Sequence, residues 1–219
     1  MNPPRATLYV EGKDDLNSII HLLRRHFIDT SEAKRSFDIR CARSGDESET
    51  ESVETLLRVM CDAIRQSRAL PVGFVVDADS RVQDRWNAVR DRLESLGVDC
   101  PRLPVEGGFV AEVHRFRTSV GVWMMPNNAD TGMLEHFLYG LIASGDLLLP
   151  IAQDATKAAI SEDRRFPEIH EHKAIVHTWL AWQEKPGLPF GTAIKAEYFR
   201  HDSANALAFV SWFKRLFSV

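Results

Sequence analysis

Cysteine is scarce in this chain of 219 residues, and the three present, Cys41, Cys61 and Cys100, lie far apart. An odd number of widely spaced cysteines argues against a disulfide framework and a zinc site, and it is typical of a reducing compartment. We therefore expect a cytoplasmic protein. The chain also lacks an apolar run of about 18 residues, so no membrane-spanning helix is predicted. The segment after Met1 lacks the apolar stretch of a signal peptide, and none is expected.

The chain also has no excess of basic residues. The chain has 27 lysines and arginines against 31 aspartates and glutamates, which gives a formal net charge of −4. Nucleic-acid binding through bulk charge is therefore excluded, and any such binding needs a local patch. The absence of a G-x-x-x-x-G-K-[ST] motif excludes ATP hydrolysis through a P-loop. Without a G-x-S-x-G motif or a convincing Cys–His pair, we expect no nucleophilic hydrolase chemistry.

Short apolar segments with the pattern of strands alternate with segments of helical spacing in the first half of the chain. The expected strands are 6–10, 37–41 and 72–76, and the expected helices are 14–27, 53–64 and 86–96. This order predicts a parallel sheet with right-handed crossovers. Two further strands are expected at 109–113 and 119–125, and they could form a hairpin.

The second half of the chain is predicted to be mainly helical. Helices are expected at 133–142, 155–160, 175–182 and 206–217, with a rigid loop at 186–191. At roughly 150 residues per domain, the length suits one domain with an appendage. We predict an α/β fold with a Rossmann-like parallel sheet flanked by helices over residues 1–150. A helical C-terminal extension over residues 151–219 is expected to pack on the same domain.

Polar residues and glycines follow four of the expected strands, 6–10, 37–41, 72–76 and 119–125, at the edge where open parallel sheets bind ligands. They are Glu11, Gly12 and Lys13, then Arg43, Ser44 and Gly45, then Asp77 and Asp79, and last Asn127, Asn128 and Asp130. Carboxylates gathered at a sheet edge are costly unless neutralised, and a hard cation such as Mg²⁺ with oxygen ligands is the simplest neutraliser. Asp77 and Asp79 could both reach one ion, while cationic side chains nearby hold a phosphate.

Other acids admit two interpretations. Asp14 and Asp15 are better explained as favourable charges in the first turn of a helix than as ligands. Glu135 stands near the start of a helix that follows the strand ending at Pro126. It is either a further metal ligand or another acid favoured by the helix dipole, and the sequence leaves both interpretations open.

The segments Val10-Glu11-Gly12-Lys13-Asp14-Asp15 and Val75-Val76-Asp77-Ala78-Asp79 together resemble the Toprim domain. Its motif is an apolar strand ending in Glu-Gly, then a strand ending in Asp-x-Asp. The family includes topoisomerases, bacterial primases, small nucleases and the nucleases of the overcoming-lysogenization-defect group. The resemblance covers the first half of the chain. It implies a Toprim-type sheet with Glu11 as general acid or base and with Asp77 and Asp79 as Mg²⁺ ligands.

The second half looks like an uncharacterised Toprim-related branch, similar to domain of unknown function family 3226. This likeness rests on residues 120–126, 132–135, 179–183 and 190–194, and no established chemistry comes with it. Two positions depart from the Toprim pattern. Arg81 stands where some relatives have a third acid, which argues against a second metal there. Asn127 and Asn128 stand where many relatives have an acid, and uncharged ligands should weaken metal affinity.

These observations and the resemblance predict Mg²⁺- or Mn²⁺-dependent phosphodiester chemistry on nucleic acid, most concretely by a small nuclease. The expected catalytic residues are Glu11 and Lys13, the expected metal ligands are Asp77, Asp79 and Glu135, and the expected phosphate contacts are Arg43, Asn127 and Asn128. By family analogy, an ATPase is the expected protein partner, in defence against phage.

Two alternatives remain open. One is a non-catalytic binding or regulatory module on the Toprim scaffold, and the other is a primase-like nucleotidyl transfer unit. Topoisomerase activity is not expected, because nothing in the chain supplies a strand-gating domain with a nucleophilic tyrosine.

Overall fold

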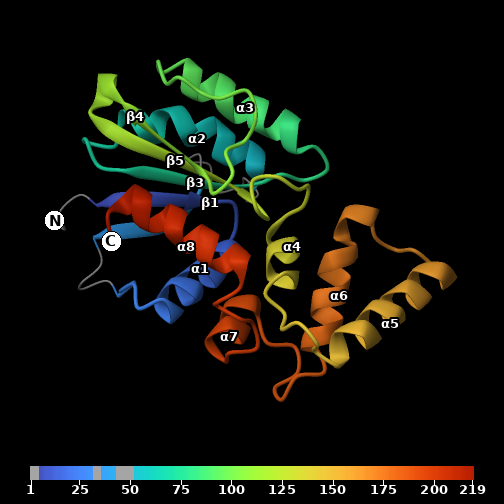
Figure 1. Cartoon of the computed structure of the whole chain (residues 1–219). Helices are drawn as coiled ribbons and strands as arrows, with labels where there is room; N and C mark the ends of the chain where they lie inside the picture. The colour runs from blue at the N-terminus through green and yellow to red at the C-terminus, as the bar shows by residue number, and fades with distance from the viewer. Residues whose placement is uncertain (1–4, 32–35, 43–51) are drawn as a thin grey trace.

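The computed structural model describes residues 5–31, 36–42 and 52–219 (Figure 1). Its strands are β1 (Ala6–Val10), β2 (Phe37–Cys41), β3 (Val72–Asp77), β4 (Phe109–Val113) and β5 (Thr118–Met125). They form one sheet in the order β2-β1-β3-β5-β4. All neighbours pair in parallel except β4, which runs antiparallel to β5 at the edge. The α/β class and the parallel sheet expected from the sequence are confirmed.

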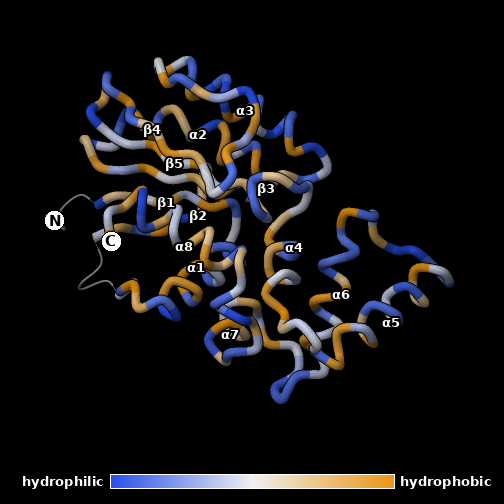
Figure 2. The backbone as a smooth tube through the Cα atoms, viewed as in Figure 1, coloured by the Kyte–Doolittle hydropathy of each residue, from blue (hydrophilic) through white to orange (hydrophobic). Residues whose placement is uncertain are grey.

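The register of the central strands positions the polar residues that follow them. β3 is buried over its first five residues, which form a continuous apolar run, and the central strands are predominantly hydrophobic in Figure 2. Tyr9 of β1 lies opposite Phe74 of β3, so Glu11 lies beside the carboxyl end of β3. Asp77 ends β3 opposite Met125 of β5. Residues that follow three different strands therefore meet at one edge of the sheet.

Helices cover both faces of the sheet (Figure 1). One layer holds α2 (Val53–Arg65) and α3 (Val82–Glu94), and the other holds α1 (Lys13–Arg25) and α8 (Ala204–Phe217). Gly73 and Gly121 are register partners, and a Cβ atom at either position would come within 3.0 Å of Leu216 on α8. Glycine at both positions therefore lets this C-terminal helix approach the sheet closely.

The remaining helices lie between β5 and α8. They are α4 (Leu134–Tyr139), α5 (Leu148–Glu162), α6 (Glu171–Leu180) and α7 (Phe190–Lys195), with a short 3₁₀ helix at Glu168–His170 before α6. Another short 3₁₀ helix, His114–Phe116, lies between β4 and β5. α5 and α6 pack on each other beside the sheet, and α7 packs on α1 (Figure 1). One hydrophobic cluster joins residues of α4 to α8 with residues of β1 and β5. The C-terminal segment thus shares the core of the sheet.

Local differences from the sequence expectations have identifiable causes. The first helix was expected to reach residue 27, but α1 ends at Arg25, and Phe27 has a φ of 60° and is 99% exposed. The expected loop at 186–191 runs into α7, which begins at Phe190 and is too short to show a helical period. In the described part of the chain, no helix is long and apolar enough to cross a membrane.

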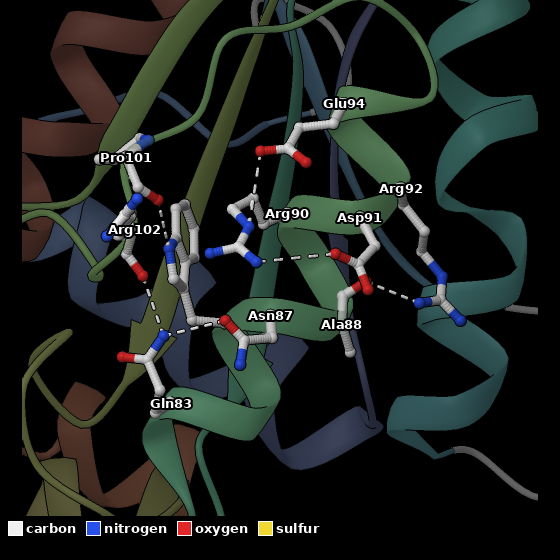
Figure 3. Close-up of polar contacts among 10 residues, drawn as sticks. Gln83, Asn87, Ala88, Arg90, Asp91, Arg92, Glu94, Pro101 and Arg102 are labelled. Atoms are coloured by element: carbon white, nitrogen blue, oxygen red, sulfur yellow. Dashed lines mark hydrogen bonds and ion pairs between the residues drawn. The ribbon is translucent and has the colours of Figure 1, made fainter.

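The loop before β4 is fastened to α3. Gln83 Nε2 donates to the carbonyl oxygen of Arg102 at 2.9 Å and to Asn87 Oδ1 at 2.9 Å (Figure 3). The indole nitrogen of Trp86 donates to the carbonyl oxygen of Pro101, also at 2.9 Å. These bonds satisfy backbone acceptors that no strand partner reaches, and they hold residues 101–102 against the start of α3.

Candidate functional site

An acidic cleft of about 320 Å³ opens at the carboxyl ends of β1 and β3. It is bounded by the first turn of α1, the start of α4 and one side chain of α6. Its lining residues are Glu11, Gly12, Lys13, Asp14, Asp15, Asp77, Met133, Leu134, Glu135 and Lys173. Carboxyl groups outnumber ammonium groups among these lining residues.

Glu11 and Asp77 form the centre of the acidic cleft. The backbone N–H of Asp77 donates to Glu11 Oε1 at 2.7 Å. Burial raises the pKa of Glu11 to about 8, although the hydrogen bond from Asp77 acts in the opposite direction. Burial, and then the charge of Glu11, raises the pKa of Asp77 well above its usual value. Asp77 Oδ1 is buried and has no hydrogen-bond partner among the described residues. Such an oxygen is costly unless it meets a proton or a cation.

Asp15 belongs to the same cleft, which the sequence analysis missed. Its Oδ2 accepts from the backbone N–H of Gly12 at 3.2 Å, so it does stabilise the start of α1 as expected. It is also only 8% exposed, and burial raises the pKa of its carboxyl to about 7. The sequence signal that could have found it is its place one helical turn after Glu11, where α1 begins at the binding edge of the sheet.

Glu135 and Lys173 make an ion pair across the wall of the cleft. Glu135 lies in the first turn of α4 and is 4% exposed, and its Oε1 lies 2.7 Å from Lys173 Nζ of α6. Burial lowers the pKa of Lys173, but the hydrogen bond and charge of Glu135 outweigh it, so the pKa is raised overall. Nothing in the sequence indicated Lys173, because its role depends on how α6 packs on α4.

Asp79 is separated from Asp77 by the turn of the chain. β3 ends at Asp77, and Asp79 has a φ of 53° and a two-way backbone bridge to Gly132 at 2.8 Å. Its carboxylate pairs with Arg85 of α3 and does not line the acidic cleft. The strand does not continue past Asp77, so the alternation of an extended strand no longer sets the direction of these two side chains.

The asparagines after β5 lie outside the acidic cleft. Asn127 Oδ1 accepts from the backbone N–H of Asp130 at 2.9 Å, and Asn128 Oδ1 accepts from that of Met124 at 2.8 Å. Both side-chain oxygens thus shape the turn at 124–130, as asparagine commonly does. Arg43, also expected to contact phosphate, lies outside the described residues.

The basic residues near the site differ in position. Lys13 is exposed at the start of α1 and lines the acidic cleft. Arg81, the departure from the Toprim pattern, pairs with Asp84 at 3.3 Å on the surface. Within residues 5–31, 36–42 and 52–219, no three histidine, cysteine or acidic side chains are already arranged to hold a metal ion.

The raised pKa values predict how stability depends on pH. In the unfolded chain Glu11 titrates near 4.5, and in the folded protein near 8. Between these values the folded state keeps a proton that the unfolded state has released, so the free energy of unfolding falls as pH rises. We expect a loss of more than about 1.4 kcal/mol, the equivalent of one pKa unit, for the metal-free protein.

The measurement is urea unfolding in chelator between about pH 5 and about pH 9. Glu11→Gln should flatten the profile in part, because Asp15 and Asp77 still titrate. Glu162→Gln, at an exposed acid of α5, is the control and should leave the profile unchanged. If the free energy of unfolding depends on pH in the same way for the wild type and Glu11→Gln, the raised pKa of Glu11 is contradicted.

The fold and the cleft define the class of protein: an α/β protein with an acidic cleft at the carboxyl edge of a mostly parallel sheet. A family model described as protein of unknown function (DUF3226) matches residues 5–218. The chain therefore belongs to this family. No curated protein and no solved structure matches it.

Proposed function

We propose that this chain catalyses metal-dependent phosphodiester chemistry on nucleic acid, most concretely as a small Mg²⁺- or Mn²⁺-dependent nuclease with a Toprim-type site. The observation that carries the proposal is the buried Asp77 oxygen without a partner, next to Glu11 in a cleft rich in carboxylates. Structural ion pairs also shift pKa values, but these acids are shifted mainly by burial, which is typical of functional sites.

The donor set of the acidic cleft suits a hard divalent cation. Its ligands are carboxylate oxygens, which Mg²⁺ and Mn²⁺ prefer, and no thiol or imidazole is found among the described residues that line it. Asp77, Asp15 and Glu135 would hold the ion, and Asp79 would join them only by leaving Arg85. When bound, the ion would polarise a phosphoryl oxygen and lower the pKa of a water molecule.

Glu11 and Lys13 are the side chains that would act on the substrate directly. With a pKa of about 8, Glu11 can hold a proton at neutral pH and exchange it, as a general acid or base must. Lys13, exposed at the mouth of the acidic cleft, would contact a phosphate of the substrate. Because the chain has a net charge of −4, its own affinity for nucleic acid should be low and sensitive to salt. A protein partner, by analogy an ATPase in phage defence, would supply the missing basic surface.

The second candidate is a non-catalytic binding or regulatory module. The ion pair between Lys173 and Glu135 favours it, because a cation tethered to α6 already neutralises one carboxylate of the cleft. In such a module the acidic cleft would need no metal.

Metal-dependent thermal unfolding tests the proposal. We expect Mg²⁺ or Mn²⁺ to raise the Tm of the wild type by several degrees over chelator, since an ion that binds only the folded state stabilises it. Asp77→Asn should melt higher than the wild type in chelator at alkaline pH, where the buried carboxyl of the wild type has to carry a repelled charge. It should also lose the response to metal.

Asp84→Asn is the matched control, because it removes an exposed acid of α3 outside the cleft. It should respond to metal like the wild type. If the wild type shows no response at millimolar metal, or if Asp77→Asn responds equally, the non-catalytic module is favoured instead.

A further inference from the structure

The turn after α1 carries an aromatic ring that the fold does not use. Phe27 is 99% exposed and has a φ of 60°, in the left-handed region. That region is strained for a bulky side chain, and an exposed ring gains nothing from burial. Folding alone therefore gives no reason for phenylalanine at this position. A strained residue with no structural benefit is a starting point for a functional hypothesis.

Two other helices end in the same backbone motif, with residues that suit it. In all three turns the N–H of the left-handed residue bonds three residues back, and the next N–H bonds five residues back. α3 has Gly97 in this place, which adopts a φ of 82° without strain. α7 has Glu197, whose carboxylate pairs with Arg25. Phe27 has neither the freedom of glycine nor such an ion pair, so its ring is available to a partner outside the chain.

Basic side chains from three helices gather around the end of α1. Burial lowers the pKa of His21, and so do the charges of Arg24 and of Lys195 from the end of α7. Burial also lowers the pKa of His26, and so does the charge of Lys214 from α8. Both ammonium groups therefore lie near α1, although they are far from it in the sequence. We call this region the Phe27 surface, and its members are Arg24, Arg25, His26, Phe27, Lys195 and Lys214.

Much of the positive charge of the Phe27 surface is not neutralised by the chain. Glu197 pairs with Arg25. Arg24, Lys195 and Lys214 are exposed and have no ion-pair partner among the described residues. The chain as a whole has a net charge of −4, so this is the kind of local basic patch that binding to a polyanion requires here.

α1 connects the Phe27 surface to the acidic cleft. Lys13 begins the helix and lines the acidic cleft, and Asn17, His21 and Arg24 follow at helical spacing on the same side. The helix has 13 residues, so its two ends lie about 20 Å apart. A chain of several nucleotides can therefore run along polar and basic side chains from the ring to the acidic cleft.

An exposed ring among basic side chains suits single-stranded nucleic acid. A base stacks on an aromatic side chain while cations contact the phosphates of the backbone. The bases of a duplex are already stacked on one another and offer no such face. A membrane surface would need an apolar helix face. The exposed side chains of α1 are instead Lys13, Asp14, Asn17 and Arg24.

We propose that the Phe27 surface binds single-stranded nucleic acid, with one base stacked on the ring of Phe27 and the phosphates in contact with Arg24, Lys195 and Lys214. Nucleic acid as the ligand rests on the proposed function. What is added is the form of the substrate, a single strand or single-stranded end that reaches the acidic cleft along α1. The basic set is small, so binding by the chain alone is weak and is strongest at low salt.

The test is fluorescence anisotropy with labelled single-stranded DNA and RNA oligonucleotides and the whole chain, in chelator at low salt. We expect Phe27→Gly to weaken binding about tenfold, because one stacked base is lost. The same variant should raise the Tm, because glycine adopts the left-handed conformation without strain. Phe27→Trp should keep the affinity. Leu103→Gly removes another exposed apolar side chain, in the loop before β4, and this control should bind like the wild type.

Two further measurements separate stacking from charge. Phe27→Gly should not weaken binding to an oligonucleotide made of abasic sites, because that strand has no base to stack. Lys195→Gln and Lys214→Gln should each reduce the slope of log affinity against log salt by about 0.7, the value for one phosphate contact on a single strand. Lys157→Gln, at an exposed position of α5, should leave the slope unchanged.

Four results would overturn the inference. They are no binding of any oligonucleotide, equal binding of the single strand by the wild type and Phe27→Gly, an equal loss for the abasic strand, and capture of the wild type by phosphatidylserine vesicles in place of oligonucleotides. The last would assign the Phe27 surface to a membrane. All are measured without metal, so failure here is distinguishable from failure of the proposed nuclease. Binding without any cleavage once metal is restored would keep this site and reject the nuclease.

Discussion

Replacing Glu11 with glutamine is expected to reduce metal-dependent cleavage of nucleic acid by about 100-fold or more, the usual contribution of a general acid or base. Glutamine keeps the shape of the side chain and can still accept the hydrogen bond from the backbone of Asp77. It cannot exchange a proton. The loss should therefore appear in the rate of cleavage and leave the fold and the Tm in metal close to those of the wild type.

The assay is cleavage of single- and double-stranded DNA and of structured RNA at low salt, in Mg²⁺ and then in Mn²⁺. Glu162→Gln is the control for a change of the same type at an exposed position of α5. Equal cleavage by the wild type and Glu11→Gln would mean that the activity comes from another site or a contaminant. No cleavage under any condition, including with candidate ATPase partners added, would favour the non-catalytic module.

Replacing Lys173 with methionine is expected to destabilise the metal-free protein by about 2–3 kcal/mol at neutral pH. Removing one partner of a buried ion pair leaves the other charge without compensation, and this costs about 3–5 kcal/mol when both partners are buried. Here the Glu135 side chain is 6% exposed and that of Lys173 is 46% exposed, so the expected cost lies at or below the lower end of that range. The methionine keeps the apolar length of the lysine, which isolates the effect of the charge.

Urea unfolding in chelator measures the effect of Lys173→Met, and Lys157→Met on the exposed side of α5 is the control. Adding Glu135→Gln to Lys173→Met should restore most of the stability, because the uncompensated charge is then gone. If the acidic cleft binds Mg²⁺, the ion should also stabilise Lys173→Met more than the wild type, since it replaces the tethered ammonium. An unchanged stability for Lys173→Met would show that the pair contributes nothing.

The strands and most helices were predictable because their signals are local. The apolar run from Val72 to Val76 indicates a strand buried on both faces, and β3 is that strand. The alternation of strands with helices then requires parallel pairing, which brings the residues after each strand to one edge. For this reason Glu11 and Asp77 could be placed together from the sequence, and the structure puts them in contact.

Which side chains complete the acidic cleft was decided by the tertiary structure. Asp79 stands two residues from Asp77, but a left-handed turn and Arg85 of α3 direct it elsewhere. Lys173 reaches Glu135 only because α6 packs on α4. A contact between helices far apart in the chain cannot be predicted from the sequence pattern of either helix. The parallel direction of the strands can be predicted, because it follows from the order of the elements.

The same division holds for the polar groups of Trp123 on β5 and Asn128 after it. The sequence by itself determined that Trp123 lies on a strand and that asparagines follow it, because strand and turn formation depend on the residue types nearby. Only the tertiary structure decided that, among the described residues, the indole N–H of Trp123 and the Nδ2 group of Asn128 lack partners, whereas the indole N–H groups of Trp86, Trp179 and Trp212 have them. Hydrogen-bond satisfaction depends on where distant backbone oxygens lie, and that is settled only when all the elements have packed.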